Sequence, residues 1–174
     1  VRTYVVVRHS GQNWYWGILK RRLLGVQLAR PQTSGQREEK SVALLDYGTL
    51  SALGKKNGLQ FETIKKIAEK ESCVIVGRCA DYALAENPNC INVFIHADKE
   101  FRTKRVAAEL QVNESKAKDA IQKKDKQRAS YYNYYTSKKW GDSRSYHLTL
   151  DSSALGIDKC VEMILQYRAL YLMK

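Results

Sequence analysis

The sequence is poor in the residues that build disulfide frameworks and metal sites. Its four cysteines, Cys73, Cys79, Cys90 and Cys160, form no Cys-x-x-Cys pair, and none of its three histidines pairs with a cysteine at zinc-ligand spacing. No apolar run approaches the roughly 18–20 residues that span a bilayer. The first residues lack the continuous apolar segment of a signal peptide. We therefore expect reduced cysteines, no structural metal, no membrane span and a cytoplasmic location.

Acidic residues are also scarce relative to basic ones. The chain has 174 residues, with 30 Lys and Arg against 18 Asp and Glu, which gives a formal net charge of +12. This excess predicts an anionic partner, and charge alone leaves nucleotide, nucleic acid and anionic membrane open. The length and the 44% hydrophobic content are sufficient for one domain with a substantial core.

Strand patterns alternate with helix patterns along the chain. The expected strands are 3–7, 73–76, 91–96 and 146–150. The expected helices are 17–24, 61–70, 99–110, 113–126 and 157–172, and residues 31–40 read as a loop. Asn113 is a good candidate for a helix N-cap. This alternation predicts a parallel sheet covered by helices.

One of these strands, 73–76, stops abruptly at Gly77-Arg78, and Asp81 follows three residues later. Ligands of open α/β sheets bind beyond the carboxyl ends of the strands. A guanidinium and a carboxylate at such an end suit a phosphate and a sugar or base edge. An ordinary salt bridge at the strand end is the alternative interpretation.

Two further pairs of charged residues, each containing arginine, occur at helical spacing. Arg102 and Arg105 are three residues apart and share a helix face, and Asp125 and Arg128 have the same separation. The guanidinium fork matches phosphate oxygens bidentately. We expect these arginines and Arg78 to converge over one anion pocket, although solvated helix faces would give the same pattern.

An aromatic cluster lies between these helices and the last strand. It interleaves with Lys138 and Lys139 and consists of Tyr131, Tyr132, Tyr134, Tyr135 and Trp140. Such residues either stack nucleic-acid bases or form the hydrophobic hinge of a mobile lid. Both interpretations remain open from the sequence.

The order of these features and the residues that compose them resemble those of the cytidylate kinases and, more closely, those of the bacterial cytidylate kinase-like proteins. The resemblance extends over about residues 59–174, and the segments that carry it are 73–82, 93–97, 125–132, 139–142 and 146–153. It implies a three-layer α/β/α fold with a central parallel sheet, similar to the P-loop NTPases. It also implies one domain over residues 1–174, with a helical lid at about 112–144.

The resemblance implies an ATP-dependent phosphotransferase that acts with Mg²⁺ on a nucleoside monophosphate or similar small acceptor. Nucleotides would be its partners, and we expect neither a membrane nor a nucleic-acid partner. The catalytic residues implied are Arg102, Arg105 and Arg128. The acceptor-binding residues implied are Arg78, Asp81, Asp125 and Arg128. Asp151-Ser152-Ser153 resembles a family tripeptide at the end of the last core strand, and there we interpret Asp151 as a cap of the turn.

The phosphate-binding loop departs from the family pattern. Arg8 matches, and the residues implied to bind ATP phosphates are Arg8, Ser10, Gly11, Gln12 and Asn13. The next three residues, Trp14-Tyr15-Trp16, are bulky where close backbone approach to a phosphate favours glycine. Either the chain is a degenerate kinase or nucleic-acid-binding protein that binds ATP poorly, or residues 1–40 as written depart from the natural sequence.

Overall fold

The computed structural model describes residues 4–9, 43–45, 57–70, 72–171 and 173. Five strands form one sheet in the order β2-β3-β1-β4-β5, and all neighbouring strands are parallel. The strands are β1 (Tyr4–His9), β2 (Ala43–Leu45), β3 (Cys73–Val76), β4 (Cys90–His96) and β5 (Leu148–Asp151). The helices described are α3 (Asn57–Lys70), α4 (Ala80–Ala83), α5 (Lys99–Leu110), α6 (Glu114–Thr136) and α7 (Ser152–Tyr171), with a short 3₁₀ helix, η1, at Ser143–Ser145.

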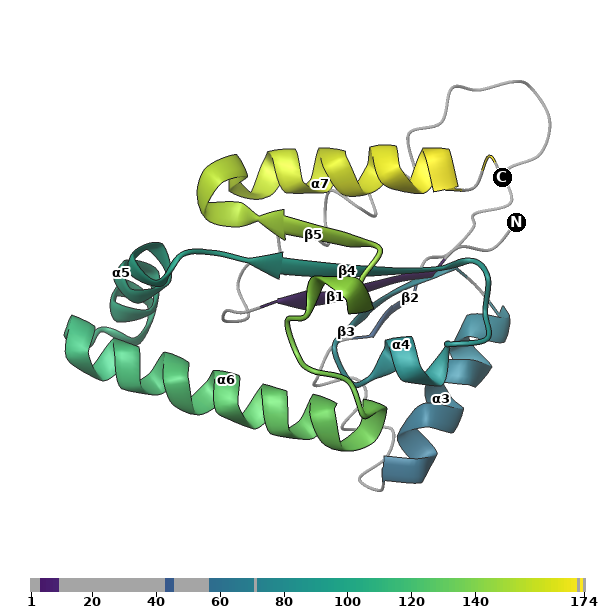
Figure 1. Cartoon of the computed structure of the whole chain (residues 1–174), viewed down its shortest axis with the longest axis horizontal. Helices are drawn as coiled ribbons and strands as arrows, with labels where there is room; N and C mark the ends of the chain where they lie inside the picture. The colour runs from purple at the N-terminus through teal and green to yellow at the C-terminus, as the bar shows by residue number, and fades with distance from the viewer. Residues whose placement is uncertain (1–3, 10–42, 46–56, 71, 172, 174) are drawn as a thin grey trace.

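Helices cover both faces of the sheet. α7 lies on one face, and α3, α4 and the carboxyl-terminal part of α6 lie on the other (Figure 1). Successive side chains of a strand point to opposite faces, so Cys73 and Ile75 join the core under α3 and α4, whereas Val74 joins the core under α7. The three-layer α/β/α fold expected from the sequence is confirmed.

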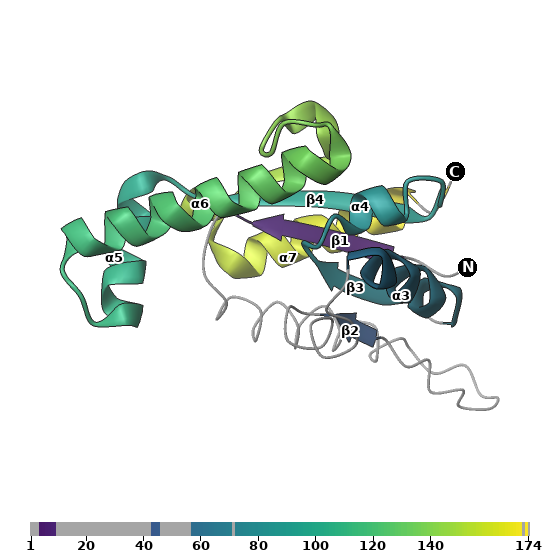
Figure 2. The same ribbon diagram turned by 90° about the horizontal axis from the view of Figure 1, so that it is seen from below.

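The parallel strands all end at one edge of the sheet. The arrowheads of β1, β4 and β5 point toward the side on which α5 lies (Figure 1). Seen from below, α5 and the start of α6 extend past this edge as a helical hairpin (Figure 2). Loops and helix starts after each strand can therefore meet here, which is where ligands of such sheets bind.

Helix α6 ends ten residues later than the sequence pattern indicated. It starts as expected, because the Asn113 side chain accepts a hydrogen bond from Lys116 N at 2.9 Å. It then continues to Thr136 and includes most of the aromatic cluster. Tyr132 is fully buried, and the Tyr135 ring packs edge-on against Phe61 of α3 at 5.6 Å. These rings therefore pack α6 against the rest of the fold. This observation favours a packing role for Tyr132 and Tyr135 over a role in stacking nucleic-acid bases.

The two terminal elements differ slightly from expectation. β5 begins at Leu148 rather than at Tyr146, because Ser143–Ser145 forms a 3₁₀ turn just before it. α7 begins at Ser152, but Gly156 has a φ of 72° and breaks the helical backbone. The regular part of α7 thus follows Gly156, close to the expected start at residue 157.

The lid at 112–144 and the single-domain organisation remain predictions. The helix expected at 17–24 and the loop at 31–40 lie outside the described residues. Within the described ranges, no helix combines the length and apolar character needed to cross a membrane.

Candidate active site

The start of α5 and the residues just before it are anchored to the start of α7, directly after β5. The Asp98 side chain caps α5 by accepting a hydrogen bond from Phe101 N at 2.7 Å. The Asp98 backbone N–H donates to Ser153 Oγ at 3.1 Å, and Ser152 Oγ donates to the His96 carbonyl at 2.9 Å. These bonds fix the direction in which α5 leaves the sheet, and with it the placement of the α5 side chains.

Asp151 belongs to the same junction. Its carboxylate accepts hydrogen bonds from the Ser153 backbone N–H, at 2.9 Å, and from the Ser153 hydroxyl. The hydroxyl bond is the main reason why the pKa of Asp151 lies below its ordinary value. Asp151 therefore caps the turn, as we interpreted it from the sequence.

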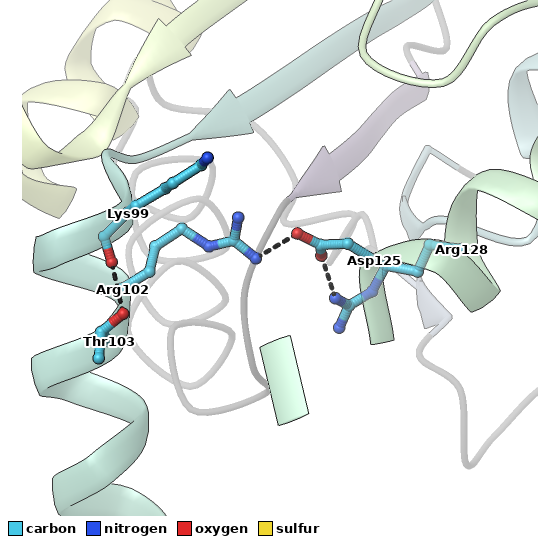
Figure 3. Close-up of polar contacts among 5 residues, drawn as sticks. All are labelled: Lys99, Arg102, Thr103, Asp125 and Arg128. Carbon is cyan, nitrogen blue, oxygen red and sulfur yellow. Dashed lines mark hydrogen bonds and ion pairs between the residues drawn. The ribbon is translucent and has the colours of Figure 1, made fainter. Parts of the chain in front are cut away.

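Two arginines from different helices converge on Asp125 (Figure 3). Arg102 of α5 donates from Nη2 to Asp125 Oδ2 at 2.6 Å, and Arg128 of α6 donates from Nη1 to Asp125 Oδ1 at 3.1 Å. One carboxylate thus holds two guanidinium groups, each on its own oxygen. The sequence spacing predicted the participants, and the structure brings them together.

This trio is partly withdrawn from water and keeps one net positive charge. Arg102 is only 8% exposed. Its Nε–H has no hydrogen-bond acceptor among the described residues. Burial lowers the pKa of Arg128, Asp125 opposes this shift, and Arg102 adds to it. A buried guanidinium with an unused donor is suited to bind a further anion, because an unpaired buried polar group is costly.

Arg105 lies one turn after Arg102 on α5 and is partly buried. The hydrogen bonds that Asp125 accepts within the described part of the chain come from Arg102 and Arg128. Arg105 is therefore close to the trio in sequence but is not bonded to its carboxylate. Its predicted catalytic role stays a prediction.

Arg78 is placed by an unusual backbone turn after β3. Gly77, Arg78 and Cys79 have φ values of 66°, 57° and 52°, so three consecutive residues are left-handed. For residues other than glycine this conformation costs roughly 1–2 kcal/mol each. Such strain is typical of functional positions held by their surroundings. Burial raises the pKa of the Tyr131 hydroxyl on α6, and the positive charge of Arg78 opposes this shift, so Arg78 lies near this part of α6.

Asp81 is turned into the interior. It is 5% exposed, and its Oδ2 accepts a hydrogen bond from the fully buried Tyr132 hydroxyl at 2.9 Å. This contact joins α4 to α6. Asp81 thus has a clear packing role, and acceptor binding by Asp81 stays a prediction.

Of the phosphate-binding residues expected near the amino terminus, the structure describes only Arg8. Arg8 lies in β1, where its backbone is in register with Phe94 of β4. Ser10, Gly11, Gln12 and Asn13 lie outside the described residues. The end of β1 is nevertheless at the central position of the sheet edge, between β3 and β4.

Sequence reasoning did not single out Lys99, and it named Tyr131 only as a member of the aromatic cluster. The Lys99 side chain extends from α5 in the same general direction as Arg102 (Figure 3). The three-residue spacing of Lys99 and Arg102 on one helix was the available signal. The hydrogen bond from the Tyr131 hydroxyl to Gln60 of α3 gave no such signal, because the two residues are far apart in the chain.

The strand order and the helical hairpin beyond the sheet edge define a kinase-like P-loop NTPase fold. Shikimate kinase from Bacteroides thetaiotaomicron shares this fold, with a TM-score of 0.55 and 14% sequence identity over 94% of this chain and 96% of that one. A crystal structure of an uncharacterized protein from Eubacterium ventriosum is more similar, with a TM-score of 0.80 and 32% identity over 97% of this chain and 99% of that one. A search of curated proteins gave no significant match.

The chain belongs to the cytidylate kinase-like family. The protein-family model for this family matches residues 37–154. The matched region contains Arg78, Arg102, Asp125 and Arg128, so the described part of the candidate site lies within it.

Proposed function

We propose that the protein is an ATP-dependent phosphotransferase that moves the γ-phosphoryl group of ATP to a nucleoside monophosphate or a similar small acceptor. The observation that carries the proposal is the convergence of Arg102 and Arg128 on Asp125, beyond the strand ends of a kinase-like fold. Its four cysteines are free, which supports action in a reducing, cytoplasmic compartment.

The described residues fit a bound phosphate. Arg102 is buried and has an Nε–H donor without an acceptor among the described residues, and phosphate oxygens accept such bonds well. Arg8, Ser10, Gly11, Gln12 and Asn13 are the proposed ATP-binding residues after β1. Within the described ranges, no group of three or more His, Cys, Asp or Glu could hold a metal ion. In this proposal Mg²⁺ would accompany ATP as part of the donor.

When bound, ATP supplies the phosphoryl group, and Mg²⁺ neutralises charge on its phosphates. Arg78 and Arg128 hold the anionic acceptor, and Asp125 fixes the Arg128 guanidinium. Arg102 and Arg105 offset negative charge that develops during transfer. A phosphate acceptor is already a nucleophile, so the chain needs no general base. Catalysis then rests on positioning and on electrostatic stabilisation.

An ADP-release assay tests the proposal directly. The acceptors are CMP, UMP, AMP, dCMP and shikimate, each tested with ATP and Mg²⁺ against a reaction without acceptor. We expect acceptor-dependent ADP release with at least one nucleoside monophosphate. Absence of turnover with every acceptor, at high protein concentration, would contradict the proposal.

The bulky sequence Trp14-Tyr15-Trp16 favours one alternative, a catalytically impaired protein that binds nucleotide or nucleic acid. It predicts no turnover, together with binding to single-stranded nucleic acid that weakens steeply as salt increases. Binding that is absent or insensitive to salt would remove this alternative. Mass spectrometry of an intact peptide that contains Tyr15 and Trp16 would establish that the loop is as written.

A further inference from the structure

The first residue of α5 is a lysine that no acid neutralises within the described ranges. Lys99 is exposed, and its ammonium takes part in none of the ion pairs that the described residues form. The acids on either side of it bond elsewhere in α5. Asp98 accepts a hydrogen bond from Phe101 N, and Glu100 accepts one from Lys104 Nζ at 2.7 Å. The Lys99 ammonium is therefore available to an anion.

The backbone of Lys99 is fixed at the sheet edge. Its carbonyl accepts a hydrogen bond from Thr103 Oγ1 at 2.7 Å, and Thr103 is buried. One residue earlier, the Asp98 N–H donates to Ser153 Oγ near the start of α7. The Lys99 side chain thus starts from a defined point, and its ammonium can adjust to a ligand.

Lys99 shares its helix face with Arg102, because residues three apart on a helix are neighbours. The two side chains extend from α5 in the same general direction (Figure 3). Arg102 is 8% exposed, and its Nε–H has no acceptor among the residues that the structure describes. A buried donor without an acceptor favours a ligand oxygen at this face of α5.

The charge of this group favours an anion with several negative charges. Lys99, Arg102 and Arg128 are cations, and Asp125 is the one acid that accepts hydrogen bonds from the two arginines in the described part of the chain. These four side chains therefore keep two net positive charges. A triphosphate matches this excess better than a single carboxylate does.

The segment expected to bind ATP phosphates has no lysine of its own. No Lys or Arg occurs in the sequence between Arg8 and Lys20, whereas the general P-loop pattern contains a lysine that reaches the β- and γ-phosphates. β1 ends at His9 and pairs with β4, and α5 begins shortly after β4. Lys99 thus follows the strand that lies next to the end of β1.

We propose that Lys99 is a catalytic residue that binds the γ-phosphoryl oxygens of ATP beside Arg102, in place of a P-loop lysine. This inference rests on the proposed function, since ATP is the donor assigned there. During transfer an acceptor oxygen forms the new P–O bond, and the bridging oxygen leaves with ADP. The Lys99 ammonium keeps its protons and donates hydrogen bonds to the γ-phosphoryl oxygens, over which negative charge is spread.

A comparison of a triphosphate with a diphosphate isolates this contact. The variant is Lys99→Met, and the matched control is Lys104→Met, an exposed lysine of the same helix. In calorimetric titrations with Mg²⁺, β,γ-imido-ATP should bind Lys99→Met about tenfold more weakly than it binds the wild type, as expected for the loss of a hydrogen bond between charged groups. ADP lacks the γ-phosphoryl group and should bind both proteins equally. The control should bind both nucleotides as the wild type does.

Steady-state kinetics give a second readout. We expect kcat/KM for ATP to fall roughly 100-fold in Lys99→Met, whereas KM for the nucleoside monophosphate should not change. Lys99→Arg keeps the charge and should recover part of the activity. Because Lys99 is exposed, both variants should unfold at the wild-type Tm.

Wild-type affinity of Lys99→Met for β,γ-imido-ATP, or an equal loss of affinity for β,γ-imido-ATP and ADP, would overturn the proposal. If the wild type binds β,γ-imido-ATP but transfers no phosphoryl group to any acceptor, the proposed function is refuted, and the comparison of the two nucleotides still decides the Lys99 contact. A wild type that binds neither nucleotide would overturn the Lys99 assignment as well.

Discussion

Replacement of Asp125 with Asn should loosen the contact between α5 and α6. The carboxylate accepts one charged hydrogen bond from Arg102 and one from Arg128, and its side chain is 22% exposed. Hydrogen bonds to charged groups contribute roughly 1.5–3 kcal/mol each, and an Asn oxygen preserves part of one of them. We therefore expect the free energy of unfolding to fall by about 2 kcal/mol. For a chain of this length, that corresponds to a decrease in Tm of about 4–8 °C.

Thermal unfolding with and without inorganic phosphate measures this effect. An anion that binds the two arginines would replace the lost carboxylate, so phosphate should raise the Tm of Asp125→Asn more than that of the wild type. The matched control is Asp119→Asn, an exposed acid on the same helix, which should unfold within about 1 °C of the wild type. A wild-type Tm for Asp125→Asn would refute the view that this carboxylate holds the arginines together.

Three further predictions concern other parts of the fold. Asn113→Ala should lower the free energy of unfolding by about 1 kcal/mol, because α6 loses its cap, and an unchanged Tm in a thermal melt would contradict this. The Asp142 carboxyl has a pKa of about 2, mainly because the Arg144 side chain bonds it, so the stability that it contributes is present above pH 3.8 and is lost as pH falls toward 2. An NMR titration of Arg144→Gln should show the Asp142 pKa back near its ordinary value, whereas an unchanged pKa would exclude Arg144 as the cause. Ellman's reagent should react slowly with the native protein, since all four thiols are buried and burial raises the pKa of Cys90 to about 12, and should detect four thiols after denaturation. Rapid reaction of native thiols would contradict this.

Local patterns predicted several elements closely. The bounds of β3 and α5 agree with the sequence prediction, because a bounded β-branched run and an amphipathic stretch after Asp98 are strong local signals. The end of α6 was not predictable in this way. Tyr132 and Tyr135 continue that helix because their rings pack against distant elements, and such tertiary contacts override weak local propensity.

In the candidate site, too, local patterns predicted some features and only tertiary contacts explain others. The spacing of Arg102, Asp125 and Arg128 identified the participants, but only the α5–α6 hairpin explains why they meet. Asp81 was predicted from its place after the strand; the structure adds a buried hydrogen bond from Tyr132, which no local pattern indicates, and its role in acceptor binding stays a prediction. The hydrogen bond from Tyr131 to Gln60 likewise joins distant residues, which no local pattern indicates.

The most direct test compares kcat/KM for phosphoryl transfer in Arg102→Met and Lys104→Met. Both residues are cations on α5, but Lys104 is exposed and pairs only with Glu100 among the acids described. We expect Arg102→Met to lose roughly 100-fold or more in kcat/KM, as is typical when a group that stabilises transition-state charge is removed. Lys104→Met should stay within about twofold of the wild type. Wild-type kcat/KM in a folded Arg102→Met variant would contradict a catalytic role for the arginines that meet at Asp125.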